Sequence, residues 1–377
     1  MILRTFGWAF SITLIGLVGA LVFGGPEALA LVAILAVLEI SLSFDNAVVN
    51  AGIVVRMNPF WQRIFLTIGV LIAVFGMRLV FPLLIVGVTA QLNPIDAVRL
   101  ALEGGSAEEP GTYGYLLSAA HPSIAAFGGT FLFVLFLDFL FEDREIRWLT
   151  WLERPLARIG QLDQLSVVVA LIVLVAAAFG LSDDPATVLV SGVLGLVVYL
   201  LVNGLSSLFE SASNDGDEEE GEEDVQPGIH GDADRIAAAA PQSRSGAAPV
   251  KVVAGRAAFF LFLYLEVLDA SFSFDGVIGA FAITQDIIII AVGLGIGAFY
   301  IRSLTVFLVR QGTLGDYVYL EHGAHWAIGA LSVILLLGIR FEVPEIITGL
   351  VGVAFIGAAF ASSLVRNRRL ARTPAVG

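Results

Sequence analysis

The chain has 377 residues, of which 58% are hydrophobic and 14% are charged, and it contains no cysteine. This composition is typical of a membrane protein, and the missing cysteine excludes disulfides, thiolate metal sites and cysteine nucleophiles. The net charge of −14, with Lys251 as the only lysine, argues against a nucleic-acid partner, because phosphate binding needs clustered basic side chains.

Long apolar runs recur along the chain and predict ten transmembrane helices, since a helix needs about 20 apolar residues to cross a bilayer. The residues that flank the first run resemble those of a signal peptide. The run is longer than the usual apolar region of a signal peptide, so we expect it to remain as a transmembrane span. The runs cover residues 6–23, 28–55, 64–89, 124–141, 165–181, 187–208, 257–283, 287–309, 324–339 and 346–364. The expected fold is an all-α polytopic membrane protein.

A polar segment, residues 211–250, separates the sixth run from the seventh. Its acidic stretch between Asp215 and Asp224 and the alanine, proline, serine and glycine that follow cannot bury a core, so we expect a disordered linker. An acidic tail that docks a soluble partner is the alternative. The linker divides the chain into a membrane half of six spans, residues 1–210, and one of four spans, residues 251–377.

The arginines predict the orientation of the chain. With ten crossings, most of them fall on one side, and only Arg99 and Arg340 fall on the other. By the positive-inside rule, both termini and the linker are expected in the cytoplasm, and the protein in the cytoplasmic membrane.

The second and seventh runs carry the same motif. Residues 41–46 read Ser-Leu-Ser-Phe-Asp-Asn and residues 271–276 read Ser-Phe-Ser-Phe-Asp-Gly, with Glu39 and Asp269 each two residues before the first serine. The repeat extends over three helices, within residues 28–141 and 257–339. Because the two motif helices cross in opposite directions, the repeat is inverted, as in many secondary transporters. The further matching residues are Gly69, Phe75 and Arg78 with Gly293, Phe299 and Arg302, and His121 and Gly128 with His322 and Gly329.

Five carboxylates and one amide lie inside these two motif runs. Charged groups within a bilayer are costly and mark ion or proton pathways, so coupling of transport to protons is expected. Oxygen ligands without thiolates suit a hard divalent cation, of which Mn²⁺ is favoured and Ca²⁺ is the alternative. A buried network with only a structural role is the competing interpretation. The expected metal ligands are Glu39, Asp45, Asn46, Glu266, Asp269 and Asp275.

Carboxylates six residues apart, such as Glu39 and Asp45, lie about 240° apart around a straight helix. We therefore expect the helices to break beside Asp45 and Asp275, where Asn46, Gly276 and the nearby serines permit a break.

Other ionisable residues surround these motifs. Arg78 and Arg302 lie within apolar runs and are expected to pair with carboxylates or to bond to carbonyl groups at helix breaks, either as gating groups or as salt bridges that fix packing. His121 and His322 begin their spans, so a capping or interfacial role is favoured over metal binding. Asp138, near the cytoplasmic end of its span, is favoured as an interfacial residue over an exit-path ligand.

The segments Glu39 with Ser43-Phe44-Asp45-Asn46, and Glu266-x-x-Asp269-x5-Asp275, resemble the two signature segments of the TerC family of integral membrane proteins. The resemblance covers most apolar segments and implies kinship with LysE-type transporters, tellurium resistance, and export of manganese or other divalent cations. It also implies that the six expected ligands form the site. The chain differs in Gly276, where many TerC-type sequences have serine, and in its extra spans and long linker.

The favoured function is therefore a divalent-cation exporter that works by alternating access, not an enzyme. The alternative is a membrane scaffold of a metal or tellurite stress-response complex, which would dock a soluble partner at the linker. An intramembrane hydrolase with paired carboxylates is less favoured, because the repeat covers whole helices and not only two aspartates. Membrane lipid and the cation are the expected partners, without a permanently bound cofactor.

Overall fold

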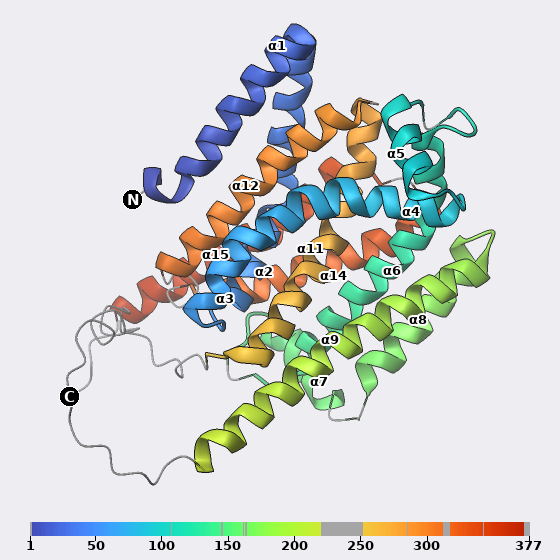
Figure 1. Ribbon diagram of the computed structural model, residues 1–377. Coiled ribbons are helices and arrows are strands. Elements are labelled where there is room, and N and C mark those ends of the chain that lie inside the picture. Colours follow the sequence, from blue (N-terminus) through green and yellow to red (C-terminus); the bar gives the residue numbers. More distant parts are fainter. Residues whose placement is uncertain are drawn as a thin grey trace, which may run out of the picture.

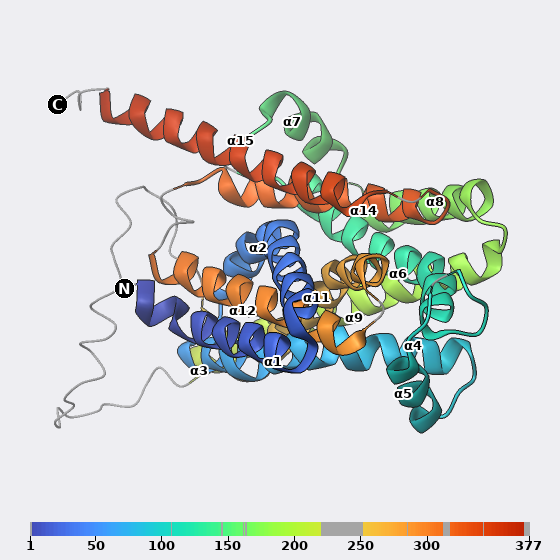
Figure 2. The same cartoon turned by 90° about the horizontal axis from the view of Figure 1, so that it is seen from above.

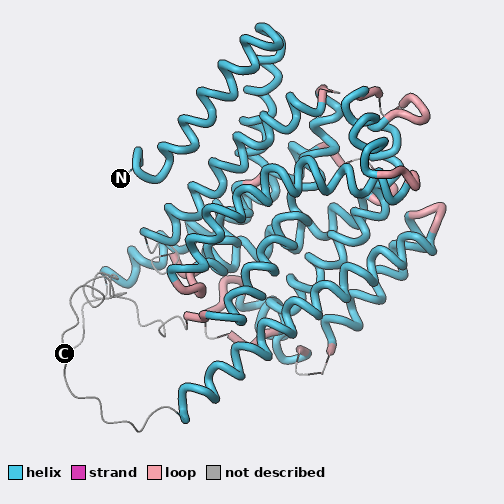
Figure 3. Tube along the Cα trace, viewed as in Figure 1, coloured by secondary structure: helices cyan, strands magenta, loops and turns pink. Residues whose placement is uncertain are grey.

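The computed structural model describes residues 2–106, 108–144, 146–160, 162, 164–219, 252–284, 286–311, 317–341 and 343–372. Within these ranges every regular element is a helix, and Met57 and Val253 form one isolated β-bridge. The predicted all-α fold is confirmed, as Figures 1 and 3 show.

The N-terminal half contains eleven elements, two of them π-helices, marked η. They are α1 (Ile2–Leu42), α2 (Phe44–Val54), α3 (Pro59–Ile64), η1 (Phe65–Gly69), η2 (Ile72–Val80), α4 (Phe81–Thr89), α5 (Pro94–Glu103), α6 (Tyr113–Phe141), α7 (Thr150–Ile159), α8 (Leu165–Leu181) and α9 (Pro185–Glu219). The C-terminal half contains α11 (Gly255–Ile283), α12 (Ile287–Gln311), α14 (Leu320–Gly338) and α15 (Glu345–Arg372).

Helix α1 is divided into two arms at Gly25. The first arm carries the first predicted apolar run, and the second arm carries the beginning of the second run. Gly25 has φ 74° and ψ −168°, a backbone conformation that residues with a side chain rarely adopt. Pro26 follows at the start of the second arm, where its missing N–H costs no helical hydrogen bond. The two arms fold back on each other in Figure 1.

Among the residues that the structure describes, six helices are long and apolar enough to cross a membrane, and a seventh span results if the helices Pro59–Gly69 and Ile72–Leu84, bent by 41°, are counted together. Large apolar side chains on their outer faces are exposed, such as Phe23 at 93% and Trp8 at 78%. Such a surface suits lipid contact and supports a multi-pass membrane protein. The six candidates are Thr5–Ile40, Tyr113–Phe141, Pro185–Leu205, Ile287–Arg310, Leu320–Gly338 and Ile347–Leu370.

The motif helices lie inside the bundle. Helix α12 packs along α1, while α6 packs against α9 and α14, and α11 contacts α2, α6, α9 and η2 (Figures 1 and 2). The largest apolar cluster includes Leu265 and Leu268 of α11, together with Phe131 of α6, and all three are fully buried. The two acidic motifs are thus placed among packed helices and not toward the lipid.

Several predicted boundaries differ from the structure. Helix α6 begins at Tyr113 and continues through Pro122, because neighbouring helices can compensate the backbone bond that an internal proline removes. Helix α9 continues to Glu219, since each added residue of an existing helix gains a backbone hydrogen bond. Helix α9 thus includes the first nine residues of the predicted linker, and residues 220–250 lie outside the described part of the chain. Helices α5 and α7 were not predicted.

Candidate functional site

The first motif contains a helix break. Helix α1 ends at Leu42 and α2 begins at Phe44, with Ser43 between them at φ −96° and ψ 16°. The backbone N–H of Ser43 donates to the Glu39 carbonyl oxygen, and its hydroxyl donates to Glu39 Oε1, both at 3.0 Å. The predicted interruption beside Asp45 is confirmed, and the break itself holds the Glu39 carboxylate.

The second motif is continuous. Helix α11 runs without interruption from Gly255 to Ile283, so the predicted break beside Asp275 is wrong. Ser271 donates its hydroxyl to the Val267 carbonyl oxygen at 3.0 Å, one turn earlier, so this hydroxyl is satisfied within the continuous helix. Gly276 permits a break but does not require one.

Glu39, Ser43 and Arg78 form the first centre. Glu39 and Arg78 are 2% and 4% exposed, and the Arg78 guanidinium donates to Glu39 Oε1 in a buried ion pair. A second guanidinium nitrogen donates to the Ala73 carbonyl oxygen at 2.5 Å. Arg78 lies in the π-helix η2, and π-turns occur frequently at functional sites.

Glu266, Asp269 and Arg302 form the second centre, also buried. Arg302 Nη2 lies 3.4 Å from Glu266 Oε1, Asp269 Oδ2 and the Gly69 carbonyl oxygen. The guanidinium carbon lies 3.8 Å from the centre of the Phe65 ring, a cation–π contact. Two carboxylates thus share one guanidinium, and Glu266 Oε2 has no hydrogen-bond partner among the described residues.

Glycines bring the helices of the two halves together at these centres. A Cβ on Gly276 of α11 would lie 3.1 Å from Glu39 Oε2, and one on Gly297 of α12 would lie 2.3 Å from Glu39 Cγ. In the opposite sense, a Cβ on Gly69 of η1 would lie 2.7 Å from Glu266 Oε1. Each acidic motif is therefore in direct contact with the other half of the chain.

Asn50 is a candidate site residue that the sequence reasoning missed. It is fully buried on α2, and neither its amide nitrogen nor its amide oxygen has a hydrogen-bond partner in the described part of the structure. Such a group needs a physical explanation, because burying an unpaired amide costs free energy. Its position four residues after the predicted ligand Asn46, on the same helix face, was the available signal.

The structure tests only part of the expected ligand set. Asp45 lies in α2 and Asp275 in α11, but their side chains fall outside what the structure describes. Among the side chains that are described, no group of three or more histidines and carboxylates is arranged to hold a metal ion. Glu39 is paired with Arg78, and Glu266 and Asp269 are brought together by Arg302, whereas Asn46 is buried on α2.

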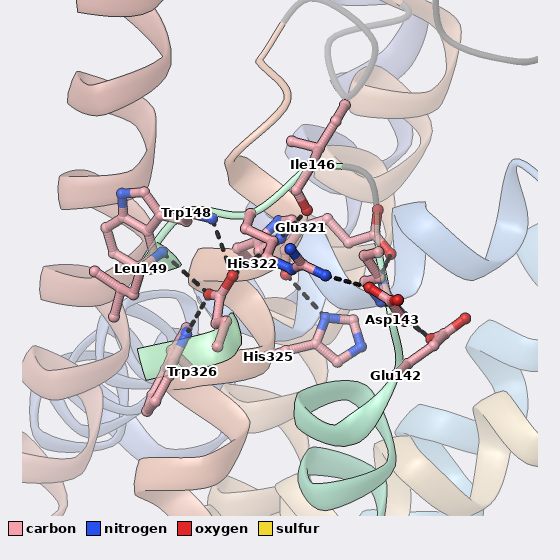
Figure 4. A network of polar contacts seen from close by, with 12 residues as sticks. Glu142, Asp143, Ile146, Trp148, Leu149, Glu321, His322, His325 and Trp326 are labelled. Carbon is pink, nitrogen blue, oxygen red and sulfur yellow. Dashed lines mark hydrogen bonds and ion pairs between the residues drawn. The ribbon is translucent and has the colours of Figure 1, made fainter. Parts of the chain in front are cut away.

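The two histidines considered as accessory residues, His121 and His322, lie away from these centres. His322 bonds to the Ile146 carbonyl oxygen through Nε2 at 2.9 Å and lies 3.8 Å from Glu153 Oε2 (Figure 4). Glu153 in turn accepts hydrogen bonds from the Trp326 indole and from two backbone N–H groups of the connection between α6 and α7. His121 lies within α6, close to Gly338 of α14.

Asp138 lies near the C-terminal end of α6 and accepts a hydrogen bond from the Tyr199 hydroxyl at 2.5 Å. Both residues line a cavity of about 750 Å³ between α2, α6, α8, α9, α11 and α14. Asp138 is thus not part of either centre, but it faces a space that adjoins the same helices.

Residues 44–370 match a family described as "Protein of unknown function (DUF475)". The match begins at Phe44, so it includes Asp45 and the whole second motif but not Glu39. No curated protein and no solved structure matches the chain.

Proposed function

Because the chain belongs to the DUF475 family, whose description assigns no function, we propose its function from its own site: it is a membrane transporter that exports a divalent metal cation. The observation that carries this proposal is the presence of two buried carboxylate–arginine centres, each in contact with the other half of the chain. Buried ionisable groups of this kind within a membrane protein mark ion pathways.

The proposed architecture is an inverted three-helix repeat. Arg78 pairs with Glu39 in the first half and Arg302 pairs with Asp269 in the second, and these residues correspond in the sequence repeat. Helix α6 of the first repeat packs on α11 of the second, and α14 of the second packs on α2 of the first. These reciprocal contacts support a pseudo-two-fold arrangement, with the substrate site between the repeats.

The proposed orientation has ten crossings, with both termini and the linker in the cytoplasm. Two ion pairs support it. Arg340 bonds to Asp183 at 3.0 Å, joining two connections predicted on the outer side. Arg144 bonds to Glu321 at 3.1 Å, joining two predicted on the cytoplasmic side.

The arginines have a specific role in the proposed cycle. A site of bare carboxylates would be costly to carry through the low-dielectric interior of the bilayer, because uncompensated buried charge is unfavourable. Arg78 and Arg302 offset part of the carboxylate charge while the site is empty. An arriving divalent cation offsets further carboxylate charge, which lowers the cost of carrying the loaded site through the conformational change.

The available donors favour a hard cation. Glu266 Oε2 and the Asn50 amide oxygen are buried oxygens without a described partner, and they add to the predicted ligands Asp45, Asn46 and Asp275. Carboxylate and amide oxygens suit Mn²⁺ or Ca²⁺, and Mn²⁺ is the first choice. The export direction and the preference for manganese rest on the resemblance to the TerC family, and coupling to protons rests on the buried carboxylates.

Flux into liposomes tests the proposal. The purified protein is reconstituted, and uptake of Mn²⁺, Ca²⁺ and Mg²⁺ is measured for the wild type, Glu39→Gln and Asp45→Asn under pH gradients of both signs. Mn²⁺ flux should fall at least about tenfold in both variants, equivalent to at least 1.4 kcal/mol of lost transition-state stabilisation.

Glu103→Gln is the matched control, because Glu103 lies at the end of α5 with a side chain that is 60% exposed. It should transport as the wild type does. Absence of flux for all three metals under every gradient would contradict the proposal, and so would equal flux in the wild type and both site variants.

A further inference from the structure

The cavity beside Asp138 is a feature that the two centres leave unexplained. Its volume is about 750 Å³, and six helices, α2, α6, α8, α9, α11 and α14, contribute to its wall together with the connections on either side of α7. Its lining is polar for a membrane bundle. The polar side chains include Arg56, Asp138, Ser166, Tyr199, Asn203 and Tyr264.

One end of the cavity approaches both acidic motifs. Val48 of α2 lines it and lies three residues after Asp45, which is about 4.5 Å along the helix axis. Tyr264 of α11 lines it and lies two residues before Glu266, about 3 Å along the axis. The cavity therefore reaches nearly the level of Asp45 in the first motif and of Glu266 in the second.

The other end lies at the helix termini. Glu142, Arg144, Glu321 and His325 line the cavity there, in the network that Figure 4 shows between the α6–α7 connection and α14. Arg144 bonds to Glu142 at 2.6 Å and to Glu321 at 3.1 Å, so each of these two carboxylates has an ion-pair partner.

The inner wall combines aromatic rings with one carboxylate. Tyr199 and Tyr264 line the cavity, and the fully buried Phe131 packs behind them, with ring centroids 5.6 Å and 6.1 Å away. Asp138 stands beside these rings, and the partner that the structure gives its carboxylate is the neutral Tyr199 hydroxyl. Asp138 is thus the lining carboxylate whose charge is not offset by an ion pair within the described residues.

We infer that this cavity is a water-filled vestibule that connects the acidic centres to the cytoplasmic side, with Asp138 as the residue that attracts a hydrated divalent cation into it. The identity of the cation rests on the proposed function, whereas access of water to the cavity does not. Three lining carboxylates against two guanidinium groups give the vestibule a net negative charge, which concentrates cations.

The absence of cysteine from the chain allows a direct test, because each introduced cysteine is the only thiol. Gly52→Cys on α2 and Asn203→Cys on α9 place a thiol on the cavity wall, and Gly52 has open space for a side chain. Val197→Cys is the matched control on α9, since Val197 is 41% exposed but does not line the cavity. A membrane-impermeant thiol reagent is added to sealed vesicles of each orientation.

Both wall cysteines should react at least about tenfold faster than Val197→Cys, because a thiol must be hydrated to ionise and react. They should react only from the side that labels Trp151→Cys on α7, and not from the side that labels Asp183→Cys between α8 and α9. Equally slow labelling of both wall positions and Val197→Cys from either side, with normal labelling of Trp151→Cys, would overturn the vestibule.

The role of Asp138 has its own readout. Mn²⁺ should slow the labelling of Asn203→Cys, and this protection should be lost when Asp138→Asn is added while the labelling rate without metal stays the same. Protection that persists in Asp138→Asn would overturn the assignment of Asp138. Labelling requires no transport, so a protein with a reactive vestibule and no metal flux would refute the proposed function and leave the vestibule intact.

Discussion

Glu39 contacts more of the site than any other described carboxylate. Its carboxylate pairs with Arg78 and accepts the Ser43 hydroxyl, while its methylene groups lie against Gly297. With 2% of the residue exposed, water cannot replace a lost partner. Glu39 and Arg78 are therefore expected to depend on each other energetically, because a single buried charge left unpaired is strongly unfavourable.

A double-mutant cycle measures this dependence. Arg78→Met should destabilise the protein by about 3–5 kcal/mol, because it leaves the Glu39 carboxylate buried without its counterion. Arg78→Met combined with Glu39→Gln should be more stable than Arg78→Met alone, since the neutral pair needs no counterion. The measurement is reversible unfolding in detergent or lipid. Strictly additive effects of the two changes would show that the pair is not coupled.

The pairing could be predicted from sequence in part. Arg78 and Arg302 lie in apolar runs at repeat-related positions, and an intramembrane arginine requires a carboxylate or carbonyl partner. The choice of partners could not be predicted, because the Arg302 contacts with Phe65 and the Gly69 carbonyl depend on how η1 lies against α12. A three-dimensional packing arrangement of this kind leaves no local sequence pattern.

At the scale of elements, the two motifs have the same sequence pattern and different backbones. The first is interrupted at Ser43, whereas α11 continues through the second. The two meet where Gly276 of α11 lies against the Glu39 carboxylate, so that a Cβ at this position would lie 3.1 Å from Glu39 Oε2. The side chain at position 276 therefore sets the distance between α11 and α1.

Substitutions at Gly276 test this spacing. Gly276→Ser should fold, because its Cβ needs a shift of only a few tenths of an ångström and its hydroxyl can donate to Glu39. Gly276→Val should destabilise by about 1–3 kcal/mol through overpacking. Gly180→Val on α8 is the control, since no atom lies within 4 Å of its Cβ. The measured quantity is the unfolding temperature. An equal decrease in unfolding temperature for Gly276→Val and Gly180→Val would contradict close packing at this contact.

The elements themselves were predicted unevenly. Helix α8 spans residues 165–181 as predicted, because an unbroken apolar run between polar turns defines both of its ends. The π-helices were not predicted, since the wider turns between Phe65 and Val80 follow from fitting Arg78 and Gly69 to neighbouring helices. Helix α5 was not predicted because it is short and amphipathic, with Ile95 and Leu102 exposed beside charged residues.

At the scale of the whole molecule, the start of α1 and the end of α15 lie at the same end of the bundle (Figures 1 and 2). Both acidic centres contain contacts between the two halves, so occupancy of the site should affect the stability of the entire membrane domain. A ligand that binds the folded state alone stabilises it by mass action.

Manganese should therefore raise the unfolding temperature of the wild-type protein. At a free concentration of about 100 times the Kd, the gain is about 2.7 kcal/mol, and a chelator should reverse it. Glu39→Gln and Asp45→Asn should abolish the shift, whereas Glu103→Gln should retain it. A shift of the same size in all four proteins would indicate nonspecific binding, for example at the acidic segment after α9, and not occupancy of the site.

The break at Ser43 bears on the proposed transport cycle. Inverted repeats can open a site to opposite sides of the membrane by exchanging conformations, and such an exchange requires halves that differ within one state. Here one half carries an interrupted helix and the other a continuous one. The proposed cycle therefore implies an opposite state in which the first motif helix is continuous and α11 is interrupted beside Asp275.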